Sequence, residues 1–261
     1  MEAAAQPYTR DELVDIITNF YQFLTTFYIP ESALKYPPEG GWPNITTDAT
    51  AGFGKSPLVV DLLRHLPYIE EDGRANLHNI HYKCNVLDYS TRTAQDFASG
   101  RIKNGEIEMS WDGPVSENVV VLAEGYESGG RNILLDVETG EITVEEIRCQ
   151  RDCQMDLKEY FEGLRRTYER LEIVPVPGNE PFEGLGGLGD EDSEELKNPL
   201  EMNRNGEDDS ILDDYDAKWI RKIYRDYGWP GPQYRKAEAL AAVGEFTSIR
   251  DQHAEDSEDE E

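Results

Sequence analysis

The sequence predicts an α+β protein in which an antiparallel β-meander packs with N-terminal, middle and C-terminal helices. Two segments, 9–28 and 156–172, place apolar residues at helical spacing with polar residues between them. Residues 117–147, which lie between these segments, contain short apolar runs separated by glycine turns. The spacers are too short for crossover helices, so we expect these strands to be antiparallel neighbours.

The first helix is expected over residues 9–28. Thr9 and Glu12 have the spacing of a capping box, in which each side chain bonds the backbone N–H of the other residue. Apolar residues recur every three or four positions, and Pro30 ends the helix. The Pro- and Gly-rich loop that follows holds Trp42, which we expect to pack as a plug over the edge of the core.

The next loop has the pattern of a phosphate-binding loop: an alanine, four residues and then Gly-Lys-Ser. Working loops follow a buried strand and offer consecutive backbone N–H groups to a phosphate. Here Pro57 has no N–H, and the residues before the loop are not an apolar strand. An N-cap at Ser56 followed by Pro57 instead predicts a helix over 57–66. The alternative is a nucleotide-binding protein or enzyme that uses Gly52, Gly54, Lys55 and Ser56.

A strand is expected over residues 76–90, which contain two histidines and a cysteine. Zinc accepts imidazole and thiolate ligands, so a zinc-stabilised domain is a second alternative. Side chains alternate between the two faces of a strand, so His81 would point away from His78 and Cys84. This favours ordinary half-buried strand residues over a zinc site. We expect no metal or other cofactor, and no nucleophile motif supports catalysis. The candidate zinc ligands are His78, His81, Cys84, Cys149 and Cys153.

The negative charge is concentrated in two segments. The formal net charge is −29, of which residues 180–216 carry −12 and residues 251–261 carry −7, so only −10 remains for the rest of the chain. Such blocks of like charge stay solvated. We expect an α+β core at 8–175, an acidic Gly-rich disordered linker at 176–215, a helical segment at 216–247 docked on the core, and an acidic disordered tail at 248–261.

Composition also limits compartment and partners. Three cysteines, the absence of a secretory leader and the lack of any apolar run of about 20 residues predict a cytoplasmic or nuclear protein that is not secreted. A strongly anionic surface opposes binding to nucleic acid and to anionic membranes. The favoured partners are therefore proteins with basic surfaces.

Residues 218–225 are basic and amphipathic, so they could dock on a partner groove. We favour the other interpretation, in which their aromatic face packs on the main domain and their cations attract the acidic linker. The candidate interaction surface comprises Trp42, Trp219, Arg221, Lys222, Tyr224 and Trp229.

Residues 117–171 resemble the C-terminal half of SUKH-superfamily domains, which include fungal regulators of cell-wall synthesis and bacterial toxin-immunity proteins. The matching features are a strand that ends at Asp136, a turn at Gly140 and an amphipathic helix over Leu157–Leu164. Other segments resemble uncharacterised proteins of filamentous fungi, which implies no activity. The SUKH resemblance implies an α+β domain that binds other proteins without catalysis, and it identifies no functional residues. We therefore expect a non-catalytic protein-interaction or regulatory module.

Overall fold

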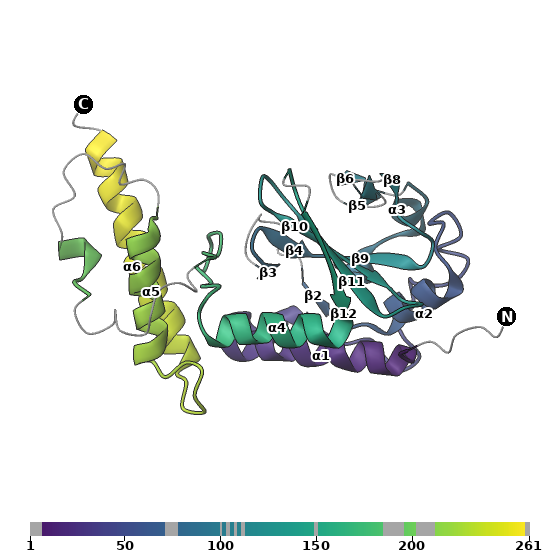
Figure 1. Cartoon of the computed structure of the whole chain (residues 1–261), viewed down its shortest axis with the longest axis horizontal. Helices are drawn as coiled ribbons and strands as arrows, with labels where there is room; N and C mark the ends of the chain where they lie inside the picture. Colours follow the sequence, from purple (N-terminus) through teal and green to yellow (C-terminus); the bar gives the residue numbers. More distant parts are fainter. Residues whose placement is uncertain are drawn as a thin grey trace. The chain divides into compact units, whose positions relative to one another are not determined.

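The computed structural model describes residues 7–70, 78–99, 101–102, 105–106, 109–110, 113–148, 151–184, 196–201 and 212–258. The chain divides into two compact units, Met1–Arg165 and Arg166–Glu261, which we describe separately (Figure 1). The boundary falls inside a helix rather than at residue 175, where the sequence analysis ended the core. Most of the expected acidic linker lies outside the described residues.

An antiparallel six-stranded sheet organises the N-terminal unit, which confirms the predicted α+β class. Its strand order is β12-β11-β10-β9-β4-β3, so β9, β10 and β11 form the expected meander. The edge strand β12 was not predicted, because its sequence is mostly polar. The strands are β3 (Asn79–His81), β4 (Cys84–Val86), β9 (Val119–Gly125), β10 (Arg131–Asp136), β11 (Glu141–Glu146) and β12 (Arg151–Asp156).

The single strand expected over 76–90 is wrong: its described part forms a hairpin of β3 and β4. Lys83 adopts a positive φ of 45°, which reverses the chain and places His81 directly across from Cys84. Lysine gives no sequence signal for such a turn, because left-handed φ values usually belong to glycine or asparagine.

Shorter elements surround the sheet. A small sheet joins β1 (Leu34–Lys35) to β2 (Tyr68–Ile69), and two further strand pairs lie between α3 and β9. Those pairs are β5 (Arg101–Ile102) with β6 (Gly105–Glu106), and β7 (Met109–Ser110) with β8 (Gly113–Pro114). The short helices are η1 (Glu31–Ala33), η2 (Tyr89–Thr91) and α3 (Ala94–Ser99).

Two longer helices begin where their capping residues predict, and a third begins after a cap that was not predicted. Thr9 and Glu12 form the expected capping box of α1 (Arg10–Phe27), and the Ser56 hydroxyl caps α2 (Pro57–His65). α4 (Leu157–Glu169) begins after Asp156, whose carboxylate accepts hydrogen bonds from the Lys158 and Glu159 backbone N–H groups. α1 and α4 lie side by side along one face of the sheet (Figure 1), with the Phe20 and Phe161 ring centroids 4.8 Å apart.

Tyr8, which lies just before α1, contacts the start of α4. The Tyr8 hydroxyl donates a 2.6 Å hydrogen bond to the Asp156 carboxylate. Its ring covers Gly140, where a Cβ atom would lie only 2.3 Å from Tyr8 Cδ2. This hydrogen bond, followed by burial, raises the pKa of Tyr8 to about 12. Burial opposes ionisation of Asp156, but the hydrogen bonds from Tyr8 and the backbone outweigh it and lower the pKa of Asp156.

The C-terminal unit contains the end of α4, residues 170–184, η5 (Pro199–Glu201), α5 (Asp214–Asp226) and α6 (Lys236–Glu258). A buried ion pair joins the two long helices, because the Arg250 guanidinium on α6 lies 3.1 Å from the Asp216 carboxylate on α5. The disordered tail expected from residue 248 is therefore wrong in its described part. α6 continues to Glu258, and its Arg250 is anchored on α5.

We predict that Tyr8→Phe lowers the free energy of unfolding by about 1 kcal/mol near neutral pH, since it removes one hydrogen bond to a carboxylate. The raised pKa of Tyr8 makes this contribution disappear as pH rises from about 10 to 12. The lowered pKa of Asp156 makes it fade as pH falls below about 4. Urea unfolding across this pH range, with Tyr36→Phe as the control, measures both effects. If the difference in unfolding free energy between wild type and Tyr8→Phe does not change with pH, the Tyr8–Asp156 hydrogen bond does not make this contribution.

We predict that Arg250→Met destabilises the C-terminal unit by about 3–5 kcal/mol, because it leaves the buried Asp216 carboxylate without this cation. The matched control is Lys222→Met, which breaks the more exposed Lys222–Asp226 pair on α5 and should cost about 0.5 kcal/mol or less. Hydrogen exchange of α6 amides, together with urea unfolding, reports the loss. Equal effects of the two variants would show that the buried pair does not hold α6.

Candidate functional site

The glycine loop before α2 has the geometry of a helix start. The Lys55 ammonium donates to the Ser116 backbone carbonyl at 3.0 Å and lies 5.8 Å from the centre of the Phe53 ring. The Ser56 hydroxyl accepts a hydrogen bond from the Val59 N–H, and Pro57 is the first helical residue. The described residues between β1 and this loop contain no strand. These contacts explain Lys55 and Ser56 without a nucleotide.

The described histidines and cysteines do not assemble into a metal site, although His81 and Cys84 face each other across the β3–β4 hairpin. His81 Nδ1 accepts a hydrogen bond from the Tyr82 N–H and lies 3.3 Å from an Arg131 nitrogen. Burial, assisted by the Arg131 charge, lowers the pKa of His81 to about 3, and burial raises the pKa of Cys84. His78 Nδ1 contacts the Glu70 carbonyl at 2.8 Å.

The other two candidate zinc ligands add nothing to this group. Cys153 is an exposed residue of β12, and Cys149 lies outside the described residues. In the described part of the chain, no three His, Cys, Asp or Glu side chains are grouped to hold a metal ion. Within the same residues, no helix is long and apolar enough to cross a membrane.

Trp42 packs as the sequence analysis expects. It is half-buried, its indole N–H donates to the Leu66 carbonyl at 2.8 Å, and its ring lies 5.8 Å from that of Tyr68. These contacts tie the Pro- and Gly-rich loop to the end of α2 and to β2. The side chain therefore has a structural explanation at the edge of the core.

Three other residues of the candidate interaction surface are interior residues of the C-terminal unit. Arg221, Tyr224 and Trp229 are all buried. The Tyr224 hydroxyl donates to the Pro175 carbonyl at 2.9 Å, and the Trp229 indole donates to the Tyr168 carbonyl at 3.0 Å. Their inclusion in an exposed surface is corrected by this burial. The amphipathic pattern of α5 reflects packing within its own unit.

Trp219 and Lys222 remain half-buried on α5. The Lys222 ammonium lies 5.9 Å from the centre of the Trp219 ring and forms an ion pair with Asp226. A lysine that already interacts with two neighbours on its own helix is explained by local stabilisation.

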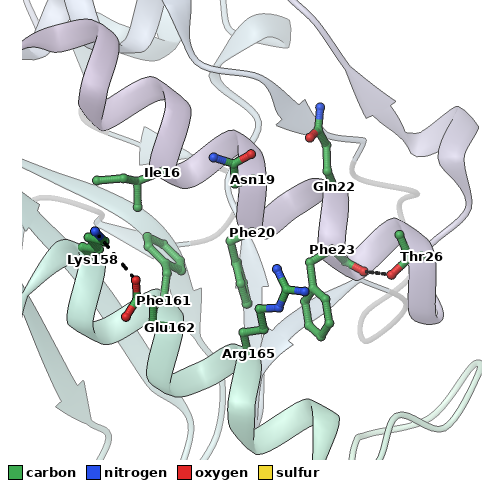
Figure 2. Close-up of a pocket in the computed structure, with 10 residues that line it drawn as sticks. All are labelled: Ile16, Asn19, Phe20, Gln22, Phe23, Thr26, Lys158, Phe161, Glu162 and Arg165. Carbon is green, nitrogen blue, oxygen red and sulfur yellow. Dashed lines mark hydrogen bonds and ion pairs between the residues drawn. The ribbon is translucent and has the colours of Figure 1, made fainter. Parts of the chain in front are cut away.

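A groove of about 480 Å³ runs between α1 and α4 (Figure 2). Its floor is aromatic: the Phe20 and Phe161 rings lie between the helices, and the Arg165 guanidinium lies 4.7 Å from the centre of the Phe23 ring. The sequence analysis missed this groove. Its residues are Ile16, Asn19, Phe20, Gln22, Phe23 and Thr26 from α1, and Lys158, Phe161, Glu162 and Arg165 from α4.

Charges differ along the groove. The Lys158 ammonium lies 3.9 Å from the Glu162 carboxylate, so these two charges compensate each other. Exposed carboxylates also lie near the starts of the two helices, at Glu12, Asp15 and Asp156, but these residues do not line the groove. Arg165 lies near the other end of the groove. The groove therefore has an aromatic floor, and its charged lining residues are Lys158, Glu162 and Arg165.

The chain matches no protein-family model, no curated protein and no solved structure. The SUKH resemblance therefore stays a prediction, and functional inference depends on the geometry of the chain itself.

Proposed function

We propose that this protein is a non-catalytic intracellular protein-interaction or regulatory module, SUKH-like in character, that binds a partner with a basic surface. The observation that supports the proposal best is the α1–α4 groove, which has an aromatic floor and whose two helices have exposed carboxylates near their starts. Aromatic floors provide contact area, and charged rims set the choice of partner and the rate of association.

The electrostatics of the whole chain favour the same class of partner. A formal net charge of −29 attracts basic proteins over long distances and repels phosphate backbones. Near the start of α1, Asp15 adds an exposed carboxylate, whereas Glu12 and Asp156 already accept hydrogen bonds as helix caps. Long-range attraction and a local docking surface together support a salt-sensitive protein interaction.

No specific observation favours the two alternatives. Lys55 contacts the Ser116 carbonyl at the start of a capped helix. His81 is held neutral beside Arg131, which makes it a poor member of a cationic or catalytic site. A nucleotide-binding function and a zinc-stabilised domain therefore have less support than the groove.

We predict that Asp15→Lys reduces retention of the partner about fivefold at low salt, because it reverses one exposed charge near the start of α1. The experiment is capture from a cell extract with wild-type protein and variants, followed by quantitative mass spectrometry. Asp48→Lys makes the same charge change at an exposed loop residue outside the groove, so it serves as the control.

The proposal requires at least one protein that wild type and Asp48→Lys retain and Asp15→Lys loses. If all three capture the same proteins in equal amounts, the groove is not the interaction site. If wild type retains no protein at low salt, the interaction function itself is wrong.

A further inference from the structure

We infer that the last turn of α4 is a conformational link between the two units: side chains that follow it in the C-terminal unit hold this turn helical, and the turn positions Arg165 in the α1–α4 groove. Loosening those side chains would therefore change the groove from a distance. The inference goes beyond the proposed function and does not depend on which partner the groove binds. It follows from the way α4 ends and from the residues that share its last turn.

α4 belongs to both units. It runs from Leu157 to Glu169, and the division between the units falls between Arg165 and Arg166. Each N–H group of an α-helix bonds the carbonyl four residues earlier. The carbonyls of Glu162 and Arg165, two residues that line the groove, therefore depend on N–H groups that lie in the C-terminal unit. The groove and the C-terminal unit share one ladder of helical hydrogen bonds.

The end of α4 has the hydrogen bonds of a Schellman cap, with a leucine at the position where glycine is usual. The Leu171 N–H bonds the Tyr168 carbonyl at 3.0 Å, and the Glu172 N–H bonds the Thr167 carbonyl at 2.9 Å. Leu171 has a φ of 58°, a left-handed conformation that is costly for a residue with a large side chain. Such strain persists only where surrounding contacts impose it.

The contacts that impose this helix end come from later parts of the C-terminal unit. Leu171 is 1 % exposed, and the buried Trp229 donates its indole N–H to the same Tyr168 carbonyl at 3.0 Å. The Arg221 guanidinium on α5 donates to the Arg170 carbonyl at 3.3 Å. These two donors lie 61 and 51 residues after the carbonyls that they bond. The last turn of α4 is therefore stabilised by tertiary contacts that its own sequence does not supply.

Arg165 connects this turn to the groove. Its guanidinium lies 4.7 Å from the centre of the Phe23 ring, and Figure 2 shows the side chain extending from α4 towards Phe23 on α1. Phe161, one turn earlier, is buried in the N-terminal unit and has a separate anchor. If the last turn of α4 unwinds, Arg165 loses the helical bond from the Glu169 N–H. Its guanidinium is then no longer positioned over the ring, while Phe161 stays in place.

The test measures the last turn and the groove separately in the full chain. Hydrogen exchange reports on the α4 amides, and the NMR signal of the Arg165 Nε–H, assigned with Arg165→Lys, reports on the groove. Trp229→Phe and Arg221→Met each remove one donor to the end of α4 but keep an apolar side chain in its place. The matched controls are Trp219→Phe and Lys222→Met, which change half-buried residues of α5 that interact on their own helix.

The inference requires both cap variants to speed exchange of the last-turn amides about fivefold and to shift the Arg165 signal, while the controls match wild type. If exchange rises but the Arg165 signal does not move, the turn does not control the groove and the inference is wrong. Unchanged exchange, or equal shifts in the controls, also overturns it. If Trp229→Phe unfolds the C-terminal unit, which fast exchange throughout α6 would reveal, the Arg165 signal must still shift. The capture experiment judges the proposed function separately from all of these outcomes.

Discussion

The N-terminal unit depends on the packing of α1 against α4 over the sheet. The Phe20–Phe161 contact joins residues that are far apart in the chain, with the paired strands of the sheet between them in sequence. Without α4, the aromatic face of α1 would lose the helix that packs against it. Without the sheet, the two helices would have no shared surface to pack on. Sheet pairing, helix docking and the groove are therefore consequences of one arrangement.

Local hydrogen bonds then fix the ends of this arrangement. The Thr9–Glu12 capping box begins α1, and Asp156 both caps α4 and accepts the Tyr8 hydroxyl. Covering Gly140 with the Tyr8 ring ties the same point to the β10–β11 turn. Because these contacts are short and polar, they set positions rather than provide the main stabilisation, which comes from apolar burial.

Sequence reasoning succeeded where the signal was local. The start of α1 at its capping box, the start of α2 at Ser56 and Pro57, and the meander of β9, β10 and β11 were all predicted. It failed where the backbone adopts a conformation that the residue type does not indicate, as at Lys83 between β3 and β4.

Polar edge strands and long-range pairings form a second class of failure. Strand β12 is mostly polar in sequence, and it is an edge strand of the sheet in the described part of the chain. The groove was unpredictable for a different reason: its two walls are about 140 residues apart, and only the sheet topology brings them together. For α5, the amphipathic pattern was recognised from the sequence, but the sequence did not show which residues its apolar face packs against. In the structure, that face packs within the C-terminal unit.

Net charge and local charge order make different contributions to recognition. The value of −29 predicts attraction to basic proteins in general, because it acts over long distances and does not depend on orientation. At the groove, both signs are present, because Lys158 and Arg165 line it together with Glu162. Net charge therefore favours a class of partner, and specificity within that class would require local contacts.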